Sequence, residues 1–176
     1  FFLVVEGGRI DLAHHDNNAF NALNETVEFA NAIAAALNAT NPDETLIIVT
    51  ADHSHVLTMG GYPTRGNPIL GKVIANDDAG NPQTDPALDR QKMPYTTLNY
   101  MNGRGFADYR NNTNGRYVRL ELEEGVDPPP FPRRVDLSDV DTQAPGFHQE
   151  AFIPFTEETH SGEDVPIYAT GPGAHL

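Results

Sequence analysis

The sequence predicts an α/β fold with a largely parallel sheet, and three segments near its start carry this prediction. Residues 1–5 are continuously apolar, residues 23–37 repeat apolar side chains at helical spacing, and residues 45–50 contain a second apolar run. A continuous apolar run is typical of a strand that is buried on both faces of a parallel sheet. The order strand, helix, strand is that of a crossover unit in an α/β sheet.

The predicted helix has one apolar face, formed by Leu23, Val27, Ala30, Ala34 and Leu37. We expect its cap at Asn24 or Thr26. Glu25 and Glu28 then fall in the first turn, where the helix dipole favours negative charge. Residues 38–44 contain Asn, Pro and Asp, and they predict a turn between the helix and the second strand.

Residues 1–59 therefore form the predicted core segment, and the composition changes after them. Residues 60–146 are rich in Gly, Pro, Asn and Asp, and we interpret them as a large insertion or a small subdomain. The proline-rich run at 128–132 is expected to be extended and linker-like. Residues 147–176 return to the core, with a short strand expected at 165–169.

The composition argues against several classes of function. The chain has 176 residues, no cysteine and a formal net charge of −14, from 25 acidic and 11 basic residues. This charge argues against nucleic acid or an anionic membrane as a partner, and no apolar run is long enough to span a membrane. Only Lys72 and Lys92 are lysines. Few lysines and many aspartates predict an acidic surface adapted to high salt, as in a halophile.

Three clusters of carboxylates and histidines lie beside the predicted strands. Glu6, Asp11 and His15 follow the first apolar run, Asp52, His53 and His55 follow the second, and Thr159-His160-Ser161-Gly162 precedes the last. Ligands of α/β sheets gather beyond the carboxyl ends of the strands, where Glu6 and Asp52 are expected. Burial of unpaired carboxylates is costly, and cations remove that cost. Without cysteine, these clusters together predict a multi-metal hydrolytic site built from histidine and carboxylate ligands.

Each cluster taken alone also has a simpler interpretation. Asp11 and His15 are four residues apart, so on a helix they could bind one ion, or they could be a capping carboxylate and an exposed histidine. Asp52 could cap a following helix, whereas His53 and His55 add donors that suit zinc. We expect His14 to contact a ligand or to lie at the surface, and His148 and His175 to be structural or exposed.

Three ordered motifs resemble the C-terminal half of the alkaline phosphatase family. They are Val-Glu-Gly-Gly-Arg-Ile-Asp at 5–11 followed by His14 and His15, Val-Thr-Ala-Asp-His-Ser-His at 49–55, and Glu-Thr-His-Ser-Gly-Glu-Asp-Val at 158–165. Pieces at 60–67 and 95–98 are similar to the animal-type branch with its crown insertion. The resemblance is strong over residues 1–71 and 146–176 and patchy between them. It implies a three-layer sandwich with a central, largely parallel sheet and a crown-like insertion.

The resemblance also implies a site with two zinc ions and one magnesium ion. Asp11, His15 and His160 would bind the first zinc, Asp52 and His53 the second, and Glu6 would belong to the magnesium site, where oxygen ligands are expected. His55 would contact Asp11 without binding the metal itself. The implied reaction is the hydrolysis of phosphate monoesters at alkaline pH, in two in-line steps through a phosphoserine.

Three functional groups of the family have no counterpart in this sequence. They are the nucleophilic serine, which follows an aspartate, the phosphate-binding arginine, and the aspartate that bridges the second zinc and magnesium. Ser54 and Ser161 stand beside ligands, and we assign neither as the nucleophile. The chain also begins inside an apolar run without an initiator Met. We therefore expect a segment that acts with the N-terminal portion of the same enzyme and is inactive alone.

Leu12 departs from the family, because many relatives have a polar or aromatic residue directly after the ligand that matches Asp11. Leucine donates no hydrogen bond, so a phosphate contact expected there is missing or filled by water.

The resemblance further implies a homodimer in the periplasm or outside the cell. Two alternatives stay open. One is a phosphodiesterase or phosphomutase of the same metal-hydrolase superfamily, and the other is a non-catalytic binding module stabilised by metal.

Overall fold

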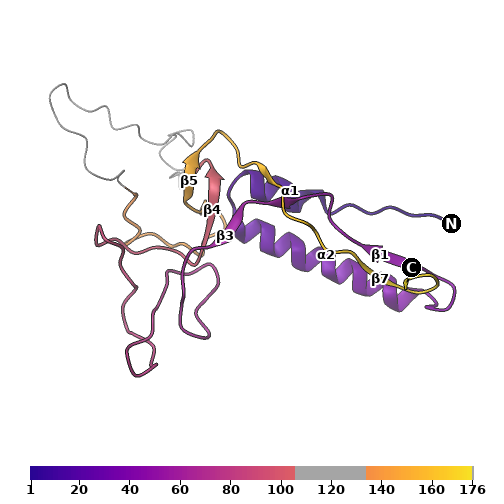
Figure 1. The fold of residues 1–176 in the computed structure, drawn as a ribbon, viewed down its shortest axis with the longest axis horizontal. Coiled ribbons are helices and arrows are strands. Elements are labelled where there is room, and N and C mark those ends of the chain that lie inside the picture. Colours follow the sequence, from indigo (N-terminus) through magenta and orange to yellow (C-terminus); the bar gives the residue numbers. More distant parts are fainter. Residues whose placement is uncertain (106–133, 176) are drawn as a thin grey trace.

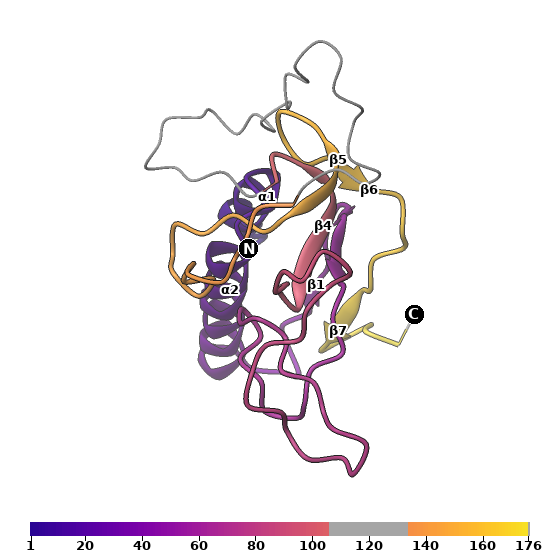
Figure 2. The ribbon, with the colours of Figure 1, turned by 90° about the vertical axis from the view of Figure 1, so that its left-hand side faces the viewer.

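The computed structural model describes residues 1–105 and 134–175, and within them it shows an α/β arrangement of two helices and three small sheets. The helices are α1 (Gly8–His15) and α2 (Ala19–Ala39). The strands are β1 (Ile47–Val49), β2 (Ser54–His55), β3 (Leu57–Met59), β4 (Leu98–Gly103), β5 (Ala151–Pro154), β6 (His160–Ser161) and β7 (Tyr168–Thr170). Both helices lie on one side of the strands (Figure 2). The predicted α/β class is therefore confirmed.

The corner between the two helices is fixed by a buried asparagine. Asn17 adopts a left-handed conformation with φ 55°, and it is fully buried. Its side chain donates a hydrogen bond to the carbonyl of Asn102 (3.1 Å) and accepts one from the backbone N–H of Arg104 (2.6 Å). Asparagine tolerates left-handed backbone better than most residues do. The end of α1 is thereby tied to the end of β4.

Helix α2 begins earlier than the sequence predicted. Its cap is Asn18, whose Oδ1 accepts a hydrogen bond from the backbone N–H of Asn21 at 2.9 Å. Gln149 accepts another from the first helical N–H at 2.7 Å. The prediction of a cap at Asn24 or Thr26 was wrong, because Asn18 and the distant Gln149 already satisfy N–H groups that a helix start leaves without partners.

The strands pair mostly in antiparallel fashion within the described residues. β1 pairs antiparallel with β7, so the returning strand exists, although it begins at Tyr168 instead of residue 165. β2 pairs antiparallel with β6, and the three-stranded sheet β3-β4-β5 combines one antiparallel and one parallel pair. A central, largely parallel sheet in a three-layer sandwich is not confirmed and stays a prediction.

Residues 1–5 are not assigned as a strand, and their side chains are 62–107% exposed. They run outward as an extended tail to the N-terminus (Figure 1). A strand buried on both faces needs layers on both sides, and the described residues supply none here. The apolar face of α2 is also partly uncovered, since Val27 is 58% and Leu37 45% exposed.

The buried apolar side chains gather around β4, the helix corner and the segment before β5. They are Ala13, Ala19, Ala22, Val73, Leu98, Tyr100, Leu137, Phe147 and Ala151. β4 lies inside the range 60–146 and is the middle strand of its sheet.

The division into 1–59, 60–146 and 147–176 stays a prediction, and the proline-rich run at 128–132 lies outside the described residues. None of the described helices has the length and hydropathy needed to cross a membrane.

Candidate metal centre

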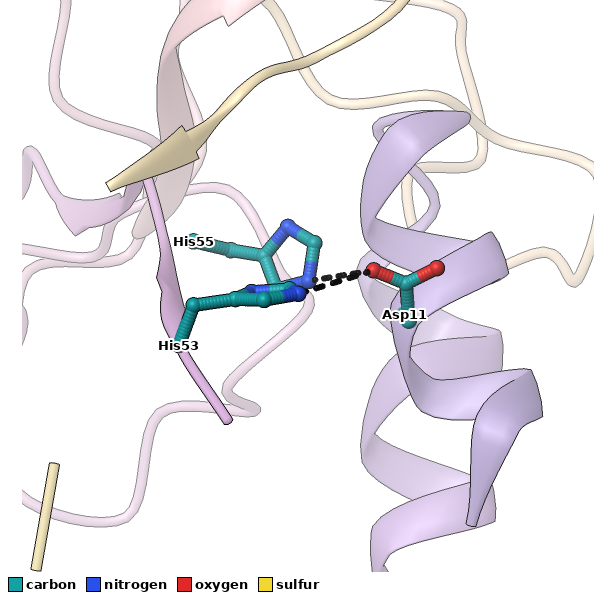
Figure 3. A group of neighbouring side chains, drawn as sticks. All are labelled: Asp11, His53 and His55. Atoms are coloured by element: carbon teal, nitrogen blue, oxygen red, sulfur yellow. Dashed lines mark ion pairs between the residues drawn. The ribbon is translucent and has the colours of Figure 1, made fainter. Parts of the chain in front are cut away.

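Strand pairing and α1 bring the predicted histidines to one place. The β2–β6 register sets His55 directly opposite His160, and His53 immediately precedes β2. α1 contributes Asp11 and His15 from one helix face, which confirms the helical interpretation of their spacing. Side chains from three segments that are distant in sequence thus meet beside α1. Figure 3 shows His53 and His55 pointing from the strand side toward Asp11 on the helix.

One oxygen atom, Asp11 Oδ1, lies at the centre of the cluster. Four imidazole Nε2 atoms surround it, those of His15 at 3.3 Å, His53 at 3.8 Å, His55 at 3.2 Å and His160 at 3.4 Å. Although over a third of the Asp11 side chain is exposed, Oδ1 itself is buried and accepts no hydrogen bond of good geometry from the described residues. A buried carboxylate oxygen without such a bond is costly, and a cation would relieve this cost.

The partners of the other ring nitrogens determine where the protons lie. Nδ1 of His15 faces the carbonyl of Glu158 (2.5 Å), Nδ1 of His53 faces the carbonyl of Ser54 (3.2 Å), and Nδ1 of His55 faces the Glu158 carboxylate (2.7 Å). Carbonyls and carboxylates only accept, so Nδ1 is the donor in all three rings. A neutral imidazole protonated on Nδ1 offers its Nε2 lone pair, which is the form that binds metal, as predicted for His15 and His53.

The distances among Asp11, His15 and His160 fit a tetrahedral zinc ion. Asp11 Oδ1 lies 3.3 Å from His15 Nε2 and 3.4 Å from His160 Nε2, and the two nitrogens are 3.2 Å apart. Ligands held about 2.0–2.1 Å from a tetrahedral zinc lie about 3.3 Å from one another. The three atoms therefore lie at separations that suit three ligands of one zinc ion.

The remaining predicted ligands, Asp52 and Glu6, are both exposed. Asp52 Oδ2 is 3.4 Å from His53 Nε2, and the Asp52 side chain is 87% exposed. Glu6 is exposed and precedes α1. Among the residues that the structure describes, neither Glu6 nor Asp52 belongs to a group of three close potential ligands. Their assignments to the second zinc and to magnesium stay predictions.

His14 and Tyr100 contact the cluster through the His55 ring. The His14 ring stacks on the His55 ring at a centroid distance of 4.6 Å, and its Nδ1 lies 2.9 Å from the Tyr100 hydroxyl. Burial, with a smaller contribution from nearby His55, lowers the pKa of His14 to about 4. Burial also raises the pKa of Tyr100 above its usual range. The hydroxyl therefore keeps its proton and shares a hydrogen bond with Nδ1 of the neutral His14 ring.

Glu158 is the residue of this site that the sequence did not single out. Its side chain is fully buried, and it joins His15 and His55 in a group of potential metal ligands. The sequence offers one weak signal, because residues two apart on an extended segment are expected on the same side, and Glu158 is two residues before His160. The neighbouring Glu157 is exposed and has the same chemistry, so composition could not separate the two.

The hydroxyls of Ser54 and Ser161 both donate to one carboxylate oxygen of Glu163. These bonds join the facing residues of β2 and β6, between the histidines of the cluster. The contact gives both serines a carboxylate partner, and the expectation that neither is a nucleophile stays a prediction. His148 is buried against the carbonyl of Asp16 (2.5 Å) and His175 is exposed, as predicted.

Residues 1–176 match the alkaline phosphatase family over their whole length. The chain is 41% identical over 176 residues to the tissue-nonspecific isozyme of alkaline phosphatase from Gallus gallus, and 41% identical over 180 residues to alkaline phosphatase 4 from Drosophila melanogaster. It is 40% identical over 177 residues to the tissue-nonspecific isozyme from Homo sapiens. Each match covers 100% of this chain but only 26–28% of the relative. Because the family match extends over the whole sequence, the chain belongs to the alkaline phosphatase family.

Proposed function

We propose that this chain supplies part of the metal centre of an enzyme that hydrolyses phosphate monoesters at alkaline pH. The observation that carries the proposal is the ring of four Nε2 atoms around the buried Asp11 Oδ1. The relatives named above are alkaline phosphatases. Their name supports the reaction class, and the geometry supports a role of these residues in holding metal.

Asp11, His15 and His160 would hold the first zinc, Asp52 and His53 the second, and Glu6 would contribute to magnesium. When bound, the ions would stabilise negative charge on the phosphate oxygens and activate the attacking groups. The reaction would pass through a phosphoserine, whose serine we assign to the N-terminal portion of the same enzyme. We propose that the chain is inactive without that portion.

Exposure differs across the cluster, and this suggests where a substrate would approach. The side chains of His160 and Asp52 are 50% and 87% exposed, whereas those of His55 and Glu158 are 9% and 0% exposed. A phosphate monoester would therefore approach from the side of His160 and Asp52. The buried side would hold the ligands in position. We further propose a homodimeric protein that acts in the periplasm or outside the cell.

The proposal is tested on the full-length protein that contains this chain. We expect two zinc ions and one magnesium ion per active site by metal analysis, together with rapid hydrolysis of a chromogenic phosphate monoester at alkaline pH. Metal without monoesterase activity would favour a phosphodiesterase, a phosphomutase or a binding module, and matching diester and phosphosugar substrates would separate these. The absence of both metal and activity would refute the proposal.

The variant His160→Ala tests the first zinc site. It removes one corner of the triangle formed with Asp11 and His15, so we expect loss of the first zinc and most of the turnover. The loss of zinc affinity and of turnover should be greater than about 10–100-fold, which is the effect typical of replacing a residue that only hydrogen-bonds to a metal ligand. His175→Ala is the matched control, because His175 is exposed and belongs to none of the groups of close potential ligands among the described residues. Full metal content and turnover in His160→Ala would contradict the assignment.

A further inference from the structure

Glu158 is a fully buried acidic residue whose polar groups face two histidines of the metal centre. Its carboxylate Oε2 lies 2.7 Å from His55 Nδ1, and Oε1 accepts a hydrogen bond from the backbone N–H of Val56 at 2.8 Å. Both oxygens therefore have a donor. A buried carboxylate without donors would be strongly destabilising, so this pair of contacts accounts for its burial.

The backbone of the same residue holds the second histidine. The Glu158 carbonyl lies 2.5 Å from His15 Nδ1, and the Glu158 N–H donates to the His15 carbonyl at 3.0 Å. Side chain and main chain of one residue thus occupy the Nδ1 atoms of His15 and His55. Both rings then turn Nε2 toward Asp11 Oδ1, at 3.3 and 3.2 Å.

We propose that Glu158 is a positioning residue that fixes the Nδ1 protons and the ring orientations of His15 and His55, so that their Nε2 atoms face Asp11. This inference rests on the proposed function only where it concerns zinc affinity. Partners of this kind set the tautomer and basicity of metal-binding histidines, and their loss weakens metal binding. Glu158 touches neither substrate nor metal in this role.

Glu158→Gln, in the full-length protein, separates this role from simple packing. Glutamine has nearly the same shape, but its single carbonyl oxygen can accept from the Val56 N–H or from the His55 Nδ1–H, not from both. Its amide N–H₂ would face the other donor, so either the Val56 N–H loses its acceptor or the His55 ring must rotate or move its proton. We expect zinc affinity, measured by competition with a chelator, to fall about 10–100-fold.

Glu157→Gln is the matched control, since it makes the same change at the adjacent, exposed position. We expect its zinc affinity to equal that of the wild type. Glu158→Asp retains the charge but shortens the side chain, and we expect it to recover only part of the affinity. Wild-type affinity in Glu158→Gln would overturn the inference.

A second measurement needs no variant and no bound metal. Neutron diffraction from the metal-free wild-type protein should show deuterium on Nδ1 of both His15 and His55. Its absence from either Nδ1 would overturn the inference even if the variant failed to fold. A wild-type protein that binds no zinc would refute the proposed function, while this measurement would still decide the role of Glu158.

Discussion

Tyr100 and His14 show how single residues contact the histidines of the candidate metal centre. The Tyr100 hydroxyl is hydrogen-bonded to His14, and His14 in turn stacks on His55. Tyr100→Phe would leave Nδ1 of the half-buried His14 ring without this partner, so we expect a loss of about 1–3 kcal/mol in the free energy of unfolding. Tyr62→Phe is the control, because Tyr62 is 91% exposed. Denaturant unfolding of the two full-length variants measures the difference, and equal stabilities would contradict the prediction.

At the scale of residues, the sequence could single out the candidate ligands that stand in short motifs, but not the residues that contact them from distant segments. Asp11 and His15 were found because a spacing of four places both on one face of a helix. Glu158 was missed because its importance comes from tertiary contacts with His55 and Val56, about a hundred residues earlier in the chain. No local pattern separates it from Glu157.

At the scale of elements, the start of α2 is stabilised by a capping residue that differs from the one predicted from the sequence. Asn18 accepts from the Asn21 N–H with its oxygen and donates to the Pro145 carbonyl with its nitrogen, at 2.9 and 2.8 Å. We expect Asn18→Ala to lower the free energy of unfolding by about 1–2 kcal/mol. Asn21→Ala keeps the N–H that is capped and improves helix propensity, so it should be neutral or slightly stabilising. Thermal unfolding of both variants tests this, and a neutral Asn18→Ala would refute the role of the cap.

The elements themselves were predicted better than their arrangement. Both the helix around residues 23–37 and the strand within 45–50 exist, because apolar periodicity reports the local backbone directly. The pairing of β1 with β7 joins segments about 120 residues apart, and its antiparallel direction is not encoded in either segment alone. Buried continuous strands were expected to be parallel, but β1 is only half-buried here.

At the scale of the whole molecule, the net charge of −14 opposes folding through self-repulsion. We propose that the surface is adapted to high salt, and we expect the melting temperature of the full-length protein to rise between low and molar sodium chloride. Sucrose at matched osmolality is the control, because it stabilises without screening charge. Equal effects of salt and sucrose would mean that charge repulsion does not limit stability.

The apolar residues at the start of the chain are exposed, and this predicts a contact with another part of the full-length protein. Phe1 and Phe2 are 107% and 92% exposed, and the chain spans about a quarter of the length of its relatives. Such a run is costly in water, so we expect the N-terminal portion of the enzyme to cover residues 1–5 as a strand within its sheet. Hydrogen exchange of the full-length protein should then show backbone N–H groups of residues 2–5 protected as strongly as those of α2. Rapid exchange there, with α2 protected, would mean that the tail stays uncovered and that the central sheet is completed elsewhere.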